Sequence, residues 1–176
     1  PVVEKICGLL GEDVYGVDVD SLEQVVGDGL RARGLTLAVA ESCTGGLLSK
    51  RITDVPGCSV YYLGGVCSYA NEVKTRLLGV RKETLDTVGA VSPEVAEQMA
   101  AGVAQALGAD VGVGITGVAG PGGGTEEKPV GLVYIGCYAL GKTKVLKCQF
   151  TGTRMENRIQ TVEDALTLAV EQLEGC

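Results

Sequence analysis

A hydroxyl and a thiol stand side by side in the segment ESCTGG, residues 41–46, which follows the apolar run LTLAVA, residues 35–40. An apolar run of this length is typical of a strand buried on both faces. Ser42 is therefore expected at a strand-to-helix turn, where backbone N–H groups can stabilise a developing negative charge. On its own this pattern is a weak signal for a nucleophilic serine. Two alternatives remain open, because a serine here is also an ordinary helix cap and Cys43 is a rival nucleophile.

The chain has 176 residues and no histidine. This absence excludes Ser-His-Asp and Cys-His catalysis and removes the commonest nitrogen ligand of zinc. Proton transfer must use lysine, tyrosine or a carboxylate, and Cys43 without an imidazole ranks below Ser42 as a nucleophile. The seven cysteines show no CxxC pair. With no signal peptide to be seen, we expect reduced, mostly buried thiols and a cytoplasmic location.

A second loop, GVAGPGGGTEEKPVG at residues 117–131, is too rich in glycine and proline for regular structure. It lacks the GxxxxGK[ST] spacing of a P-loop and does not match GxGxxG at a helix start. Its charge cluster EEK, residues 126–128, interrupts the glycines. The cluster is either part of a ligand site or the solvated tip of a surface loop.

Composition excludes several classes of protein. With 22 acidic and 15 basic residues the net charge is −7, the opposite of the positive field that draws proteins onto phosphate backbones. Aromatic residues make up only 4% and tryptophan is absent, so a base-stacking platform has little to be built from. No apolar run approaches the roughly 18 residues that span a bilayer. We therefore expect neither a nucleic-acid partner nor a membrane partner.

Positioning these loops requires alternating helices and strands. Asp20 with Glu23 predicts a helix start with a capping arrangement, and Gly34 predicts its end. Ser92-Pro93 opens a clearer helix that Gly108 closes. Periodicity and turn signals predict further helices at 47–53, 71–78, 82–87 and 154–173, and strands at 35–40, within 59–69, and at 110–116, 130–139 and 144–150.

This order of elements predicts an α/β fold of three layers, α/β/α, with a mixed sheet of five to six strands between helical layers. The strands at 130–139 and 144–150 form a hairpin around Leu140-Gly141. Ligands collect at the carboxyl ends of strands in such sheets, which is where the loops at 41–46 and 117–129 are expected. Residues 1–19 are interpreted as a lead-in or linker, and residues 20–176 as one domain.

The chain resembles the CinA carboxy-terminal domain family over residues 20–172. The resemblance rests on LAVAESCTGGLLSKRITDVPGCS, VCSYANEVKTRLLGV, GAVS and GITGVAGPGGGTEEKPVGLVYIG, in that order. Stand-alone members of this family are nicotinamide mononucleotide amidohydrolases. The resemblance therefore implies hydrolysis of this nucleotide to nicotinic acid mononucleotide and ammonia, as part of pyridine nucleotide salvage. An alternative is a catalytically silent nucleotide-binding or regulatory domain.

The family resembles serine amidohydrolases that use a Ser/Lys pair, which agrees with the lack of histidine. By resemblance, Ser42 is the nucleophile and Lys74 the general base, with Tyr69 as a further catalytic residue and Asn71 in the same site. The alternatives are a Tyr69 packed on the sheet and an Asn71 that caps its helix. The rest of the AESCTGG motif would bind substrate or supply oxyanion donors: Glu41, Cys43, Thr44, Gly45 and Gly46.

A mononucleotide is anionic, so an acidic protein needs a local cationic pocket. Arg154 and Arg158 share one face of the last expected helix and are the first candidates for the phosphate, the alternative being two solvated arginines. The other contenders are Lys128 and the glycine-rich backbone at Gly120, Gly122 and Gly123. Gly152-Thr153-Arg154 departs from the Gly-Asp-Arg that is frequent in the family.

No step of this chemistry calls for a metal or cofactor. The resemblance also implies a homo-oligomer, a dimer or higher. The segment ICGLLGEDVYGVD, residues 6–18, resembles the connection to an amino-terminal molybdopterin-binding-like domain in two-domain CinA proteins. Such a domain is therefore an expected covalent partner.

Overall fold

The computed structural model describes residues 5, 8–9 and 21–175. In this part of the chain one mixed sheet has the strand order β2-β1-β3-β4-β5. The strands are β1 (Leu37–Glu41), β2 (Tyr62–Cys67), β3 (Val111–Gly117), β4 (Leu132–Ala139) and β5 (Lys142–Gln149). Strands β2, β1 and β3 are parallel, and β4 is antiparallel to both β3 and β5. The predicted α/β fold with a mixed sheet is therefore confirmed.

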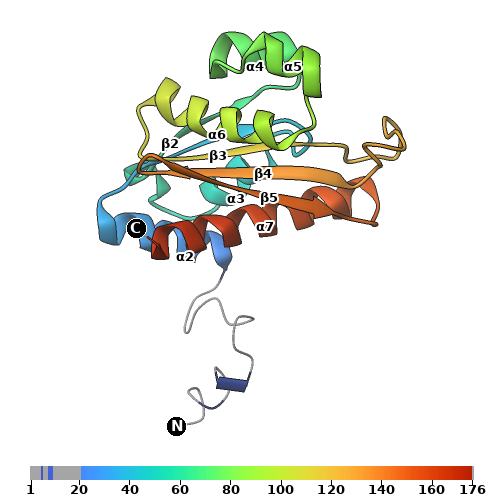
Figure 1. Ribbon diagram of the computed structural model, residues 1–176. Coiled ribbons are helices and arrows are strands. Elements are labelled where there is room, and N and C mark those ends of the chain that lie inside the picture. Colours follow the sequence, from blue (N-terminus) through green and yellow to red (C-terminus); the bar gives the residue numbers. More distant parts are fainter. Residues whose placement is uncertain (1–4, 6–7, 10–20, 176) are drawn as a thin grey trace.

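Helices cover both faces of the sheet (Figure 1). They are α2 (Leu22–Arg33), α3 (Leu47–Thr53), α4 (Asn71–Leu78), α5 (Lys82–Val88), α6 (Pro93–Leu107) and α7 (Arg154–Glu174). Helices α2, α3 and α7 lie on one face, and α6 lies on the other with α4 and α5 stacked on its outer side. No helix among the described residues is both long and apolar enough to cross a membrane.

Two apolar clusters hold these layers together. The larger one lies between the sheet and α2, α3 and α7 and includes Val39, Ile135 and Leu166. The smaller one lies under α6 and includes Ala40 and Met99. Strand β1 is buried along its whole length and presents apolar side chains to both clusters, as its unbroken apolar sequence predicts. Strand β3 presents its apolar side chains to the larger cluster and turns Gly112 and Gly114 toward α6.

Helix starts agree with the sequence except at α2. Ser92 caps α6 by accepting the Val95 N–H, as predicted. Helix α2 instead begins after Ser21, whose hydroxyl accepts the Gln24 N–H. The capping arrangement predicted for Asp20 and Glu23 is wrong, because Ser21 is the N-cap. The Glu23 carboxylate binds Arg51 of α3. Asp20 itself and almost all of the predicted linker 1–19 lie outside the described residues.

The predicted hairpin is confirmed with a shift of its second strand. Ala139 pairs with Lys142, so β5 begins two residues before the predicted position 144. Leu140 and Gly141 form the connection with φ of 47° and 87°. A two-residue turn with both φ values positive matches the right-handed twist of the flanking strands.

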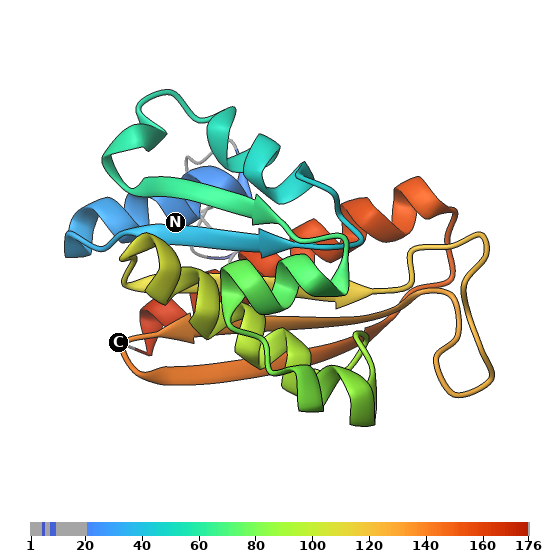
Figure 2. The same ribbon diagram turned by 90° about the horizontal axis from the view of Figure 1, so that it is seen from above.

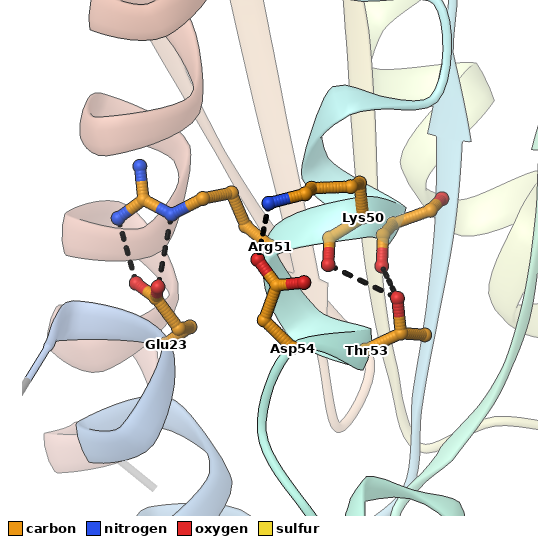
Figure 3. Close-up of polar contacts among 6 residues, drawn as sticks. Glu23, Lys50, Arg51, Thr53 and Asp54 are labelled. Atoms are coloured by element: carbon orange, nitrogen blue, oxygen red, sulfur yellow. Dashed lines mark hydrogen bonds and ion pairs between the residues drawn. The ribbon is translucent and has the colours of Figure 1, made fainter.

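Two ion pairs on α3 differ in burial (Figure 3). Arg51 and Glu23 join α3 to α2 through a 2.6 Å contact with side chains 24% and 11% exposed, whereas Lys50 and Asp54 pair within α3 at 65% and 49%. Burial works to raise the pKa of Glu23, but the hydrogen bonds and charge of Arg51, with other hydrogen bonds, outweigh it and lower the pKa.

We expect Arg51→Ala to lower the free energy of unfolding by about 1.5–3 kcal/mol, because a carboxylate loses its charge-assisted hydrogen bonds. Lys50→Ala, the matched control, should cost no more than about 0.5 kcal/mol, since its pair is exposed. The loss in Arg51→Ala should shrink as the pH falls through the lowered pKa of Glu23, because the protonated carboxyl no longer gains from the arginine. Denaturant unfolding at pH 7 and pH 4 measures this. Equal losses in both variants would contradict it.

Candidate active site

Four strands end at the same edge of the sheet. Strands β1, β2 and β3 are parallel, and β5 returns to their direction after the antiparallel β4. Figure 2 shows the arrowheads of β1, β2 and β3 pointing the same way. The segments after these strands carry the predicted site residues, namely loop 41–46, the turn at 68–70, loop 117–131 and the start of α7. The topology therefore gathers residues that are far apart in the sequence.

Lys74 lies beside Ser42 at this edge. Its side chain comes from α4, is 1% exposed, and its Nζ lies 3.3 Å from Ser42 Oγ. The same Nζ donates a hydrogen bond of 2.6 Å to the Ser68 carbonyl oxygen. Among the described residues, no carboxylate forms an ion pair with this amine. The predicted nucleophile and base are thus within reach of each other.

Burial lowers the pKa of Lys74, and the nearby Cys43 and Cys67 thiols oppose this shift only in part. Desolvation disfavours the ammonium form of a lysine, whereas an acidic partner would restore it. A neutral amine has one lone pair and two N–H groups. It can therefore donate to Ser68 while its lone pair accepts the proton of the Ser42 hydroxyl.

The rival nucleophile is held in its unreactive form. The Cys43 side chain is 6% exposed and belongs to the larger apolar cluster. Burial raises the pKa of the Cys43 thiol to about 11, so the thiol stays protonated at neutral pH. Because the thiolate is the reactive species, this environment favours Ser42 over Cys43.

Glu41 organises the loop that follows β1. Its carboxylate is 1% exposed and accepts hydrogen bonds from the N–H groups of Gly46, Leu48 and Ser49 at 2.9–3.1 Å, and from the Ser49 hydroxyl at 2.7 Å. The carboxylate of Glu41 therefore occupies the amino terminus of α3, where the helix dipole favours a negative charge. Glu41, predicted to bind substrate, is engaged here in shaping the loop.

The same contacts decide which N–H groups remain for an oxyanion. The Gly46 N–H is used by Glu41, and the Gly45 N–H donates to the Ser42 carbonyl. Within residues 21–175, the N–H groups of Cys43 and Thr44 donate to no backbone carbonyl. The N–H groups that remain as candidate oxyanion donors are therefore those of Cys43 and Thr44, fewer than the predicted set from Cys43 to Gly46.

The helix-cap alternative for Ser42 is wrong. The N-cap of α3 is Gly46, which has φ of 96° and no side-chain cap. Ser42 lies four residues earlier, and its hydroxyl faces Lys74. The carboxylate of Glu41 supplies the cap from the end of β1, which leaves the serine hydroxyl for chemistry.

Arg154 and Arg158 reach from α7 to the loops of the site. Arg154 donates to the Gly120 carbonyl at 2.7 Å and to Tyr69 Oη at 2.9 Å. Arg158 donates to the Thr44 carbonyl at 2.6 Å. The Nε–H of Arg158 is buried and has no partner in the described part of the chain. The alternative of two freely solvated arginines is therefore wrong.

Tyr69 is 60% exposed and is held by Arg154, so the alternative that packs it on the sheet is wrong as well. Asn71 is exposed at the first position of α4, whose N-cap is Ala70 without a side-chain hydrogen bond. The capping alternative for Asn71 is thus also wrong.

Lys128 donates to the Val88 carbonyl at the end of α5. Gly122 and Gly123 are exposed in the glycine-rich loop, and neither touches Ser42 or Lys74.

Comparison with known proteins places this geometry in a family. The sequence model of the family described as CinA C-terminal domain matches residues 19–173. The chain belongs to the CinA C-terminal domain family. It is 57% identical over 159 residues to a putative competence-damage inducible protein of Moorella thermoacetica, with 90% of this chain and 38% of that protein covered. It is 64% identical over 135 residues to a CinA-like protein of Desulfovibrio desulfuricans, with 77% and 32% covered.

Solved structures of CinA proteins share the fold. The competence/damage inducible protein CihA from Agrobacterium tumefaciens has a TM-score of 0.84 at 38% identity, with 92% of this chain and 98% of that chain covered. A CinA superfamily protein from Klebsiella pneumoniae also has a TM-score of 0.84, at 32% identity with 89% and 100% covered. The chain thus spans less than half of the length of the curated CinA relatives but nearly all of these solved chains.

Two residues of this CinA domain shape the site without having been predicted. Ser68 supplies the carbonyl that holds Lys74. Asn157, 1% exposed, donates to the Ala119 carbonyl and accepts the Gly152 N–H, so it joins α7 to the glycine-rich loop. Ser68 precedes Tyr69 inside a motif, and Asn157 stands between two candidate arginines. Their positions next to candidate site residues were the only signal in the sequence that could have pointed to them.

Thr153, which stands where the family often has aspartate, caps α7. Its hydroxyl accepts the Glu156 N–H, and the Glu156 carboxylate accepts the Thr153 N–H at 2.7 Å, which completes a capping box. An aspartate at this position would cap the helix in the same way. The threonine therefore keeps a capping role at the start of α7, where Arg154 is placed.

We expect Lys74→Met to unfold at the same temperature as the wild type or higher at pH 7, because the buried amine disfavours folding while the unfolded chain carries a hydrated ammonium. The folded pKa is lowered, so this disadvantage is full below it and vanishes as the pH rises to 10.5, the ordinary value. Thermal melts from pH 7 to pH 10 measure the difference between the two proteins. A variant that melts well below the wild type at pH 7 would contradict the expectation.

Proposed function

We propose that this CinA domain is a serine amidohydrolase that converts nicotinamide mononucleotide into nicotinic acid mononucleotide and ammonia. One observation carries the proposal. The Nζ of the buried Lys74, which forms no ion pair among the described residues, lies 3.3 Å from Ser42 Oγ. A chain without histidine has this amine as the base nearest to its candidate nucleophile. An amide is the functional group of this nucleotide that such a pair attacks.

Acylation begins when neutral Lys74 accepts the Ser42 proton as Oγ bonds to the carboxamide carbon. The carbonyl oxygen becomes an oxyanion, and the proposal assigns its stabilisation to the N–H groups of Cys43 and Thr44, which donate to no backbone carbonyl within residues 21–175. The C–N bond then breaks as the Lys74 ammonium gives its proton to the departing NH2 group. Ammonia leaves and the nicotinoyl group stays on Ser42 as an ester.

Deacylation uses the same groups in the opposite sense. Lys74, neutral again, takes a proton from water while the water oxygen bonds to the ester carbon. The second tetrahedral intermediate collapses with cleavage of the bond to Ser42 Oγ, and the Lys74 ammonium returns the proton to that oxygen. The products are the carboxylic acid form of the nucleotide and free enzyme, so atoms and protons balance.

The charges of the site support an anionic substrate. A guanidinium has five N–H donors, of which Arg154 uses two and Arg158 uses one in the contacts above. Donors therefore remain for a phosphate at the start of α7. The glycine-rich loop, held against Arg154 through Gly120, offers the second wall of the subsite. Homo-oligomer formation, the linked amino-terminal domain and the cytoplasmic location stay predictions.

We expect Ser42→Ala and Lys74→Ala each to lower the rate of ammonia release from nicotinamide mononucleotide by at least about 10³-fold, since one removes the nucleophile and the other its base. Cys43→Ala keeps the backbone N–H and should fall far less. Ammonia release with saturating substrate measures all three. Tight binding without turnover by the wild type would favour the silent nucleotide-binding module, and a loss in Cys43→Ala as deep as in Ser42→Ala would overturn the choice of nucleophile.

The pH dependence follows from the lowered pKa of Lys74. Only the neutral amine can accept the serine proton, so kcat/KM should rise as the pH rises through this pKa and then level off. The apparent pKa should lie below 10.5, the ordinary value for lysine. Initial rates at low substrate concentration over pH 6–10 give the profile. A rate that does not change over this range would speak against Lys74 as the base.

A further inference from the structure

The helix that carries Lys74 rests on another helix rather than on the sheet. In Figure 1, α4 lies on the outer side of α6, which separates it from the strands. The buried residues of α4 are Lys74 and Leu78, one turn apart on the same face. The position of the Lys74 amine therefore depends on how closely α4 approaches α6.

That approach is set at one glycine. A Cβ placed on Gly102 of α6 would lie 1.8 Å from the Leu78 carbonyl oxygen and 2.8 Å from its carbonyl carbon. Both are backbone atoms, so no side chain can turn away to make room. The last turn of α4 thus touches the bare backbone of α6, one turn beyond Lys74.

Helix α6 cannot yield toward the sheet. A Cβ on Gly112 or Gly114 of β3 would lie 2.1 Å from the Ala100 carbonyl oxygen or 2.5 Å from its nitrogen, and one on Gly136 of β4 would lie 2.5 Å from the Ala96 carbonyl oxygen. The backbone of α6 is therefore already in close contact with β3 and β4. Any atom added on its outer side must displace α4 instead.

We propose that Gly102 is a positioning residue that fixes the distance between the Lys74 amine and the Ser42 hydroxyl. Three backbone layers, β3 with β4, α6 and α4, are stacked at the spacing that glycine permits. The base stands at the outer end of this stack, and the nucleophile follows β1 within the sheet. As far as activity is concerned, the proposal rests on the function proposed above.

A methyl group at residue 102 must push the Leu78 carbonyl away by more than 1 Å to reach an ordinary contact distance, given the 1.8 Å that the Cβ would otherwise have. The Lys74 contact with Ser42 is already 3.3 Å long, so a shift of this size takes it out of hydrogen-bond range. A misplacement of about 1 Å costs on the order of 10²-fold in rate when reacting groups must be aligned.

The test compares Gly102→Ala with Gly29→Ala. Gly29 lies inside α2, and a Cβ there meets Leu173 Cδ1 at 3.4 Å, which is close to an ordinary contact. Both changes add one methyl group to a helix interior. We expect kcat for nicotinamide mononucleotide to fall about 10²-fold in Gly102→Ala with KM within about threefold of the wild type. Gly29→Ala should keep both constants.

Crystal structures of the wild type and Gly102→Ala give a readout that needs no substrate. The proposal expects α4 to move outward and Lys74 Nζ to leave Ser42 Oγ while the sheet and α6 stay in place. An unchanged Nζ–Oγ distance in Gly102→Ala overturns it, as does a displaced α4 with undiminished kcat. If the wild type hydrolyses nothing, the proposed function fails, and the crystallographic comparison still decides whether Gly102 sets the distance.

Loss of stability is separated from loss of position by a second variant. Alanine is the better helix former at residue 29, so Gly29→Ala/Gly102→Ala adds stability from α2 without touching α4. The proposal expects this double variant to be as impaired in kcat as Gly102→Ala alone. Recovery of kcat together with the melting temperature would show that Gly102 acts through stability only and would overturn the proposal.

Discussion

A buried amine that pairs with no carboxylate of residues 21–175 is the constraint on which the site depends. Lys74 is as buried as the apolar core, yet its contacts are a carbonyl and a hydroxyl. A carboxylate in the same place would stabilise the ammonium and remove the base. The acidic residues among those described must therefore be kept away from this nitrogen. The fold does so by presenting main-chain groups and neutral side chains to it.

Glu41 is the acidic group that stands closest in sequence to Ser42, and hydrogen bonds hold its carboxylate in the loop after β1. Its carboxylate faces the amino terminus of α3, where three N–H groups and a hydroxyl receive it. The same contacts leave the N–H groups of Cys43 and Thr44 without a backbone carbonyl to bind within residues 21–175. One carboxylate thus determines both the shape of the loop and the direction in which its free donors point.

Sequence reasoning predicted the elements and named Ser42 and Lys74 as candidates, but it did not predict the contacts that hold them. Periodicity placed α4 at 71–78, and the motifs placed Ser42 and Lys74 by resemblance; their proximity follows from parallel strands that end at one edge. The role of Glu41 escaped prediction, because a polar residue at a strand end does not reveal which way it faces. Gly102 gave no signal, since a glycine within a helix acquires meaning only when its neighbour across the interface is known. The start of α2 was misplaced because Ser21 and Asp20 are adjacent and both are good caps, and the N-cap in the structure is Ser21.

The Ser68 carbonyl has a consequence for how this site tolerates mutation. In a serine protease triad, the group that orients the base is an aspartate side chain, which a single substitution can delete. Here the orienting acceptor for Lys74 belongs to the main chain, so every amino acid at position 68 would bring it. The genetic code offers no codon that removes this contact directly. Only changes that bend the turn after β2 can misalign the amine, which makes the orientation of the base a property of the backbone path rather than of residue identity.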